Sequence, residues 1–283
     1  MIKAYAKVNL RLKVVGKRPN GYHDLEMINI SVDLSDSLSI KKNKSGDIII
    51  RCNNPLLPTD DNNIVHKVVK YIKETYQISD GFEIMIDKKI PIGAGLGGGS
   101  SDAAAMINWF NNEYRLNLSE DALIGLALKF GADVPYCLYG QPAIVTGIGE
   151  EINFIKLNLP KYLLLITPPI NVSTKEIFND YDRLISKENS DLNYRTNIYK
   201  KQKNNELMEN DLMEVTFNKH PILEKMKRFL ESLSKRKVMM SGSGPSLFCL
   251  FDSLNEANQI KDQYQERYPN HYINVTQIIN VEK

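Results

Sequence analysis

Apolar and polar residues alternate along the start of the chain. Every even position from residue 4 to 14 is apolar, while Lys7 and Asn9 belong to the other, more polar set. This two-residue period predicts a half-buried strand. Similar runs at residues 27–40 and 47–52 follow a turn at residues 19–21, so we expect the opening of the chain to form a β-sheet.

A three- and four-residue spacing of apolar positions takes over after this sheet. It predicts a helix over residues 64–76, with Asp61 or Asn62 as its cap. Residues 82–86 alternate again as a strand, which runs into a glycine-rich segment and then into a helix-forming run at residues 103–110. Ser100, Ser101 and Asp102 are the cap candidates for this second helix.

A bend is expected around Asp133. Ser119 is placed to cap a helix that ends at Gly131. Beyond it, Pro135 disfavours helical geometry at Val134, so Asp133 is predicted to lie on a bend outside any helix.

A new strand and helix pattern begins at residue 162, which places a domain boundary near residue 156 and predicts domains at 1–156 and 157–283. The second half carries clear local signals: a capping box at 173–176, a polar connection at 184–207, an amphipathic helix at 221–233, a glycine turn at 241–246 and a strand at 247–251.

Composition narrows the class of protein. The 283 residues are 42% hydrophobic and 25% charged, which is typical of globular proteins and excludes disordered, collagen-like and membrane classes. Lys and Arg number 36 against 34 Asp and Glu, so no general positive field favours nucleic acid. Neither an export signal nor an apolar run of membrane-spanning length is visible, and we expect no membrane partner. The three distant cysteines, Cys52, Cys137 and Cys249, favour reduced thiols and a cytoplasmic location.

Five glycines fall within residues 93–99, between a strand and a helix. Without side chains, successive backbone N–H groups can converge on one anion, and the helix adds its positive N-terminal end. A dinucleotide site would need an acidic residue at the end of the next strand, and the candidate Glu113 lies in a helical stretch. A P-loop would need lysine where Gly99 stands. The segment therefore predicts a phosphate-binding loop of another kind.

Three motifs resemble those of the GHMP kinase superfamily, and they occur in the family's order. They are Ala6-Lys7-Val8-Asn9-Leu10, the segment from Pro91 to Ala104, and Ser241-Gly242-Ser243-Gly244-Pro245-Ser246-Leu247-Phe248. The resemblance implies an α+β fold of two domains, with an N-terminal ATP-binding and catalytic domain and a smaller C-terminal α/β sandwich domain. A substrate cleft is expected between them.

Four further segments, at 21–23, 61–64, 131–135 and 210–212, resemble the branch of this superfamily that acts in non-mevalonate isoprenoid biosynthesis. That branch phosphorylates the 2-hydroxyl of a small cytidine diphosphate substrate. The resemblance therefore implies ATP with Mg²⁺, and a monomer or weak homodimer. Two alternatives stay open: another small-molecule GHMP kinase, for homoserine, mevalonate or a sugar, and a nucleotide-binding relative without catalysis.

The resemblance also implies roles for individual residues. Asp133 would be the catalytic base, Lys7 would orient it and stabilise developing charge, and Asn9 would bind a substrate hydroxyl. ATP would be bound by Gly93, Gly95, Leu96, Gly97, Gly98, Gly99, Ser100 and Ser101, with Asn62 at the adenine. Tyr22 and Phe178 would stack on the cytosine while His23 bonds its edge, and Thr174 and Gly242 would complete the substrate site. No metal ligand is assigned with certainty.

Overall fold

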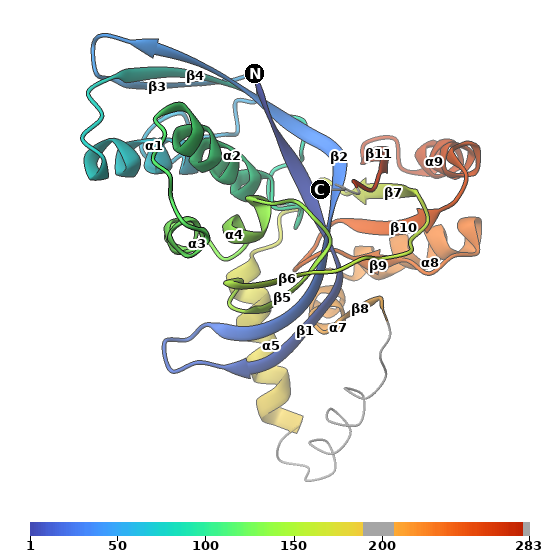
Figure 1. Cartoon of the computed structure of the whole chain (residues 1–283). Coiled ribbons are helices and arrows are strands. Elements are labelled where there is room, and N and C mark those ends of the chain that lie inside the picture. Colours follow the sequence, from blue (N-terminus) through green and yellow to red (C-terminus); the bar gives the residue numbers. More distant parts are fainter. Residues whose placement is uncertain (189–206, 280–283) are drawn as a thin grey trace.

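The computed structural model describes residues 1–188 and 207–279 (Figure 1). Two long antiparallel strands, β1 (Ile2–Lys17) and β2 (His23–Asn43), form a bent hairpin that runs through the molecule. In their register Lys7 lies opposite Ser31 and Asn9 opposite Asn29. The alternation in the sequence thus predicted a strand correctly, and the even positions from Ala4 to Leu12 are buried. The strand is not half-buried, however, because the polar Lys7, Asn9 and Lys13 on its other face are buried as well.

The hairpin is the centre of a seven-stranded sheet. The other strands are β3 (Ile48–Cys52), β4 (Gly81–Asp87), β5 (Ala143–Gly147), β6 (Glu151–Phe154) and β8 (Glu209–Asn210). Their order is β3-β4-β2-β1-β8, and β5 pairs with both β2 and β6. Strand β8 comes from the second half of the chain and lies parallel to β1.

Helices cover one face of this sheet at its β3–β4 end (Figure 1). They are α1 (Ile64–Thr75), α2 (Gly98–Glu113), α3 (Glu120–Leu128) and α4 (Val134–Cys137). Phe82 of β4 meets Phe110 of α2 edge to face at 5.0 Å, inside a core built from both layers. This apolar contact fixes the direction in which α2 leaves the glycine loop.

A second, four-stranded sheet has the order β11-β7-β10-β9. Its strands are β7 (Tyr162–Thr167), β9 (Met239–Met240), β10 (Leu247–Phe251) and β11 (Tyr272–Gln277), with the helices α5 (Thr174–Glu188), α7 (Met213–Lys219), α8 (Pro221–Ser234) and α9 (Leu254–Arg267) in the same half. Helices α8 and α9 lie on the outer side of this sheet, away from the hairpin (Figure 1). Within the described ranges, no helix combines the length and apolar character that crossing a bilayer requires.

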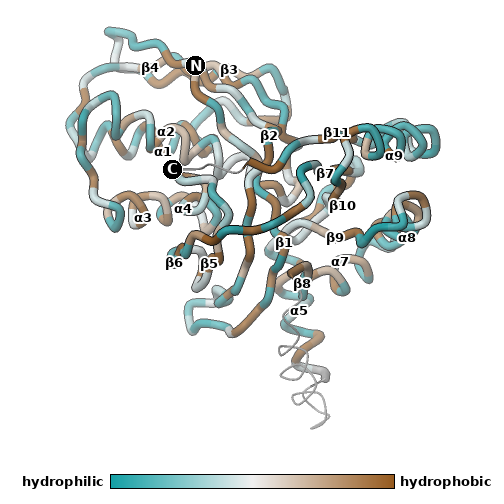
Figure 2. The backbone as a smooth tube through the Cα atoms, turned by 45° about the vertical axis from the view of Figure 1, so that its right-hand side comes forward, coloured by the Kyte–Doolittle hydropathy of each residue, from teal (hydrophilic) through white to brown (hydrophobic). Residues whose placement is uncertain are grey.

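The two sheets share one hydrophobic core. Val8 and Leu10 of β1 pack with Leu163, Leu165 and Phe248 of the second sheet, and all five are fully buried. Figure 2 shows hydrophobic segments along the central strands, where the two halves of the chain meet. The mixed α and β fold expected from the sequence is confirmed. The boundary near residue 156 stays a prediction, because this core and β8 join the two sides of it.

Two helix starts differ from their predictions. Asn63, and neither Asp61 nor Asn62, caps α1, because Asn63 is extended and its Oδ1 accepts the Val65 N–H at 2.8 Å. Helix α2 begins at Gly98, before the expected caps, because Gly97 adopts the left-handed conformation and turns the chain directly into the helix.

The prediction that Val134 lies outside a helix was wrong. Val134 opens the short helix α4, since Pro135 falls in the first turn, where its missing N–H removes no helical hydrogen bond. The polar connection was expected from residue 184, but α5 continues to Glu188, and residues 189–206 of that connection lie outside the described part. The predicted cap of α3 at Ser119 and the start of α8 at Pro221 are confirmed.

Candidate active site

A cavity of about 520 Å³ lies where β1, the glycine loop, α5 and the loop before β10 meet. This volume lies within the range of about 300–1,000 Å³ that small-molecule sites span. Its wall contains most of the residues that the sequence singled out: Lys7, Asn9, Gly93, Gly95, Leu96, Gly97, Gly98, Gly99, Ser100, Asp133, Thr174, Phe178 and Gly242. The fold therefore brings segments that are far apart in the sequence to one site.

The glycine loop reaches α2 through a residue that has to be glycine. Gly97 has a φ of +65°, and a Cβ atom there would lie 2.8 Å from Cγ of Lys7. The Lys7 N–H donates to the Leu96 carbonyl at 3.0 Å, which ties the loop to β1. The first N–H groups of a helix have no helical acceptor. Those of Gly98, Gly99 and Ser100 are therefore available to an anion in the cavity.

The two glycine loops are in direct contact. A Cβ atom on Gly95, whose φ is +74°, would lie 2.4 Å from the Ser241 carbonyl oxygen. The Ser241 hydroxyl donates to the Gly95 carbonyl at 2.9 Å and accepts the Asn9 N–H at 3.2 Å. Ser241 thus joins all three family motifs at the cavity.

Asn210 holds the glycine loop at residues 241–246 in place by hydrogen bonds to its backbone. Its amide nitrogen donates to the carbonyls of Met240 and Gly242, each at 2.8 Å, and its oxygen accepts the Leu212 N–H at 2.9 Å. All polar atoms of this buried amide that can bond are therefore engaged. The Asn-Asp-Leu segment noticed in the sequence lies behind the cavity and fixes its wall.

Lys7 and Asp133 form the polar centre of the cavity. Nζ of the buried Lys7 lies 3.2 Å from Oδ2 of Asp133 and donates to Oδ1 of Asn9 at 2.7 Å. The Asn9 amide nitrogen in turn donates to Oδ1 of Asn29 at 2.7 Å. The Asp133 side chain makes no capping bond to α4 and is 32% exposed. A carboxylate that is held on one side and open on the other can accept a proton from a bound alcohol.

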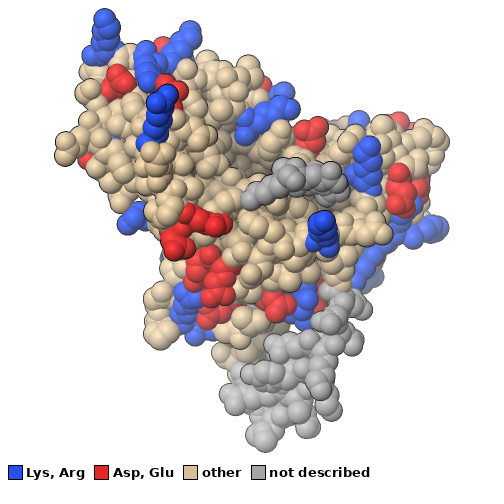
Figure 3. Space-filling view, in the orientation of Figure 1, with Lys and Arg blue, Asp and Glu red and all other residues tan. Residues whose placement is uncertain are grey.

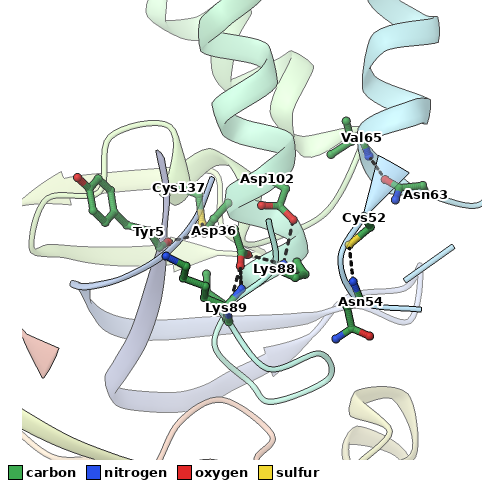
Figure 4. Close-up of polar contacts among 12 residues, drawn as sticks. Tyr5, Asp36, Cys52, Asn54, Asn63, Val65, Lys88, Lys89, Asp102 and Cys137 are labelled. Carbon is green, nitrogen blue, oxygen red and sulfur yellow. Dashed lines mark hydrogen bonds and ion pairs between the residues drawn. The ribbon is translucent and has the colours of Figure 1, made fainter. Parts of the chain in front are cut away.

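A buried cluster of charges lies behind the phosphate loop (Figure 4). Nζ of Lys88 donates to Oδ2 of Asp102 at 2.9 Å and also to Oδ2 of Asp36. Oδ1 of Asp36 accepts the N–H groups of Lys89 and Ile90 at 2.6 and 2.9 Å. Burial, opposed by Lys88, raises the pKa of Asp102 to about 7.

This cluster was not predicted from the sequence. Lys88 also lines the cavity, and a Cβ atom on Gly98 would lie 3.1 Å from its Nζ. No local pattern marks Lys88, because its two partners are 52 and 14 residues away in the chain. Asp102 was interpreted as a helix cap, although the helix begins four residues earlier.

The two serines after the glycines have different surroundings. Ser100 lines the cavity. The Ser101 hydroxyl instead donates to the Tyr5 carbonyl at 2.6 Å, lies 3.3 Å from Sγ of Cys137, and is outside the cavity wall. Ser100 is thus the hydroxyl that the structure brings to the predicted phosphate site.

Asn62 lies outside the cavity wall. Its side chain donates to Oδ2 of Asp60 at 3.1 Å, and the residue is exposed. Its assignment to adenine stays a prediction. Within the described residues, no group of three His, Cys, Asp or Glu side chains is placed to hold a metal ion.

The residues expected at the cytosine divide into two pairs: Thr174 and Phe178 line the cavity, whereas Tyr22 and His23 lie outside its wall. Phe178 and Thr174 line the cavity, and the Thr174 hydroxyl lies 2.8 Å from that of Ser243. The His23 ring stacks on Phe178 with a centroid distance of 4.8 Å and an interplanar angle of 20°. Tyr22 is 57% exposed and lies outside the cavity wall. The structure therefore joins His23 to Phe178 and leaves Tyr22 at the surface.

Charges of both signs share the face shown in Figure 3. Acidic side chains gather over β5, β6 and α5, and basic side chains gather over the β3–β4 end. At the tip of the β1–β2 hairpin, Arg18 pairs with Asp24, at 2.7 Å, and with Glu150, at 2.9 Å.

The chain matches two family models. These are the GHMP kinases N terminal domain over residues 63–141 and the GHMP kinases C terminal over residues 198–270. Among curated proteins, the 4-diphosphocytidyl-2-C-methyl-D-erythritol kinase of Clostridium beijerinckii is 40% identical, with 97% of this chain and 99% of that protein covered. The protein of the same name from Lachnoclostridium phytofermentans is 41% identical, with 93% of this chain and 92% of its own length covered.

Solved structures show the same relationship. A 4-(cytidine 5'-diphospho)-2C-methyl-D-erythritol kinase superposes with a TM-score of 0.75 at 25% identity, with 98% of each chain covered. A homoserine kinase from Cytophaga hutchinsonii superposes with a TM-score of 0.68 at 19% identity, with 98% of this chain and 94% of that chain covered. The second likeness concerns the fold alone.

Proposed function

This chain belongs to the 4-diphosphocytidyl-2-C-methyl-D-erythritol kinases of the GHMP kinase superfamily, and we propose how its cavity performs the reaction. The enzyme is a phosphotransferase of isoprenoid precursor biosynthesis. It transfers the γ-phosphoryl group of ATP to the 2-hydroxyl of the substrate. The substrate oxygen bonds to the γ-phosphorus, the bond to the β-phosphate oxygen breaks, and ADP leaves.

Asp133 is the base in this proposal. Its open side accepts the proton of the 2-hydroxyl as that oxygen attacks phosphorus. Lys7, 3.2 Å from Asp133, keeps the carboxylate in place and offsets negative charge that develops at the reacting centre. The Asn9 Oδ1 accepts a hydrogen bond from Nζ of Lys7. The side-chain amide that was expected to bind a substrate hydroxyl is therefore already engaged. We infer that Asn9 acts on the substrate through the position of Lys7.

The N-terminus of α2 binds the transferring phosphate. Phosphoryl transfer depends mainly on position and charge stabilisation, and the free N–H groups of residues 98–100 provide both. Mg²⁺ bound to ATP phosphates usually keeps several waters and few protein ligands. The Ser100 hydroxyl in the cavity wall fits such a site as a candidate ligand. The ion would neutralise charge on the phosphates.

The single observation that carries this proposal is the Lys7–Asp133 ion pair beside the glycine loop in one cavity. Proximity of a base, a cation and an anion site is what an alcohol kinase requires. Strand β1 supplies the cation, the residue before α4 supplies the base, and the N-terminus of α2 supplies the anion site. The arrangement therefore depends on the tertiary fold and on all three segments.

The test is a coupled assay of ADP release with the purified protein, ATP and Mg²⁺. We expect turnover with 4-diphosphocytidyl-2-C-methyl-D-erythritol and little with homoserine or mevalonate at equal concentration. Turnover with one of those alcohols alone would replace the proposed substrate. ATP binding without ADP release for any alcohol would instead indicate a nucleotide-binding protein that lacks catalysis.

A further inference from the structure

Asp182 of α5 connects the helix to the tip of the long hairpin. Its Oδ1 lies 2.8 Å from Nε2 of His23, and its Oδ2 accepts a hydrogen bond from Nζ of Lys17 at 2.6 Å. Asp182 stands four residues after Phe178, so the two side chains share one face of α5. The same helix face thus holds the His23 ring at its edge through Asp182 and on its flat side through Phe178.

This contact determines which ring nitrogen of His23 bears the proton. A carboxylate can only accept, so a neutral imidazole beside it must carry its hydrogen on Nε2. Burial opposes ionisation of Asp182, but the hydrogen bonds from Lys17 and His23 outweigh burial and lower its pKa. Lys17 donates to the other oxygen of this carboxylate, so the hairpin tip engages both oxygens of Asp182.

The other nitrogen of the ring is then a free acceptor. Within the described part of the chain, the His23 ring forms its hydrogen bond through Nε2, to Asp182. The ring is nearly covered, with 8% of its side chain exposed, and it stacks on a residue of the cavity wall. An unprotonated nitrogen in this place accepts hydrogen bonds and repels carbonyl oxygens.

We propose that Asp182 is a positioning residue that holds His23 with Nδ1 as an acceptor and thereby selects a pyrimidine with an amino group over one with a carbonyl group. Cytosine presents an amino donor at the position where uracil presents an oxygen. The selected class of ligand is therefore a cytidine nucleotide. This inference rests on the proposed function, since it explains how that substrate is distinguished from its uridine analogue.

The first measurement examines the ring without any substrate. ¹⁵N NMR at pH 8, where an ordinary imidazole is neutral, distinguishes protonated from unprotonated ring nitrogens, and the chain has four histidines to assign. We expect a hydrogen on Nε2 and none on Nδ1 of His23. In Asp182→Asn the amide can also donate to Nε2, so we expect a mixture of the two tautomers. A hydrogen on Nδ1 of the unmutated protein would overturn the proposal.

The second measurement is the ratio of kcat/KM for the cytidine substrate to that for its uridine analogue. We expect Asp182→Asn to lower this ratio about ten-fold, the effect of one unpaired polar group. Asp180→Asn is the matched control, because Asp180 lies on the same helix and pairs with Arg183 and Lys219 without contacting His23. It should leave both the ratio and the NMR signals unchanged.

The two measurements separate the inference from the function beneath it. A preference for cytidine that stays unchanged in Asp182→Asn would overturn the role of Asp182 and leave the kinase assignment intact. Equal kcat/KM for both nucleotides in the unmutated protein would remove the recognition of the base from the proposed function, and this inference with it. A fall in the ratio for Asp180→Asn as large as for Asp182→Asn would show a general effect of helix charge and would also overturn the proposal.

Discussion

The phosphate end and the base end of the cavity are built differently. At the phosphate end Lys7 and Asn9 are buried and bonded to each other, and three segments of the chain meet there through Ser241. At the base end Tyr22 is 57% exposed, and His23 is held by a hydrogen bond to Asp182 of α5. Reacting groups are thus placed on the rigid core, while groups that select the substrate lie on a hairpin tip.

This difference predicts how each end responds to substitution. A change at the phosphate end removes the reacting carboxylate, or the buried Lys7 charge beside it, or the backbone contacts that hold the loop, so catalysis or folding should suffer strongly. After a change at the base end, water can solvate the groups that lose a partner, so the fold should persist. Only the affinity for substrate, or the preference between substrates, should change. The following changes test that division.

Asp133→Asn should have the largest effect on turnover. The amide cannot accept the proton, and general-base catalysis contributes about a hundred- to ten-thousand-fold, so kcat should fall within that range. Calorimetry should show that ATP still binds, because the glycine loop is unchanged. Asp121→Asn, at an exposed position of α3, is the control and should keep full activity. Near-normal kcat in Asp133→Asn would show that another group removes the proton.

Lys7→Met removes a buried charge and keeps most of the side-chain length. We expect kcat to fall about a hundred-fold or more, since removal of one electrostatic stabiliser costs that much in other active sites. The KM for the substrate should change much less. If the loss appears only in KM, Lys7 anchors the ground state and does not stabilise the transition state.

Gly95→Ala should destabilise the fold where the two glycine loops touch. The new Cβ would lie 2.4 Å from the Ser241 carbonyl oxygen at a φ of +74°. Backbone strain and overpacking together are expected to lower the free energy of unfolding by about 2–4 kcal/mol. Urea unfolding measures the loss. Gly125→Ala is the matched control. A Cβ atom at this helical position would have no other atom within 4 Å, so the free energy of unfolding should rise by up to about 1 kcal/mol.

The motifs predicted much of the phosphate end because its chemistry depends on local sequence. A run of glycines before a helix implies an anion site wherever it occurs, and the period of β1 placed Lys7 and Asn9 on one face. The start of α2 was missed by a few residues, because the left-handed Gly97 is selected by its contact with Lys7. That contact joins residues 90 positions apart and leaves no local trace.

The sequence could not predict the partners that come from distant segments. Lys88, Asp36 and Asp102 meet only after β2, β4 and α2 have packed, and each alone has the pattern of a surface residue or a cap. Asp182 similarly has the pattern of a solvated helix position until the hairpin tip reaches it. Val134 entered a helix against the usual effect of the following proline, because Asp133 to Cys137 close one short turn.

The buried charge cluster should make stability depend on pH. The pKa of Asp102 is about 7 in the folded protein, against about 3.9 for an unfolded chain. The folded state therefore binds this proton more tightly. The contribution of Asp102 is fully present below about pH 4 and is lost as pH rises through about 7.

Asp102→Asn removes this titration. The free energy of unfolding of the unmutated protein should fall between pH 5 and pH 8 by on the order of 2 kcal/mol more than that of Asp102→Asn. Urea unfolding at several pH values measures both slopes. Asp33→Asn, at an exposed position of β2, should keep the slope of the unmutated protein. Equal slopes in the unmutated protein and Asp102→Asn would mean that Asp102 stays ionised across this range.

Tyr22→Leu should have the smallest effect, and that effect should be confined to the base end. Tyr22 is more than half exposed, so its loss should leave the free energy of unfolding nearly unchanged. If Tyr22 stacks on the pyrimidine, the change should raise KM for the cytidine and uridine compounds alike, by up to about ten-fold, because an aromatic face does not distinguish the two bases. Phe178→Leu is the informative partner, since it also removes the surface on which His23 rests. Phe178→Leu should weaken the binding of both compounds and also reduce the ratio of kcat/KM for the cytidine compound to that for the uridine compound. A change in discrimination with Tyr22→Leu, or none with Phe178→Leu, would reverse the roles that we assign to the two rings.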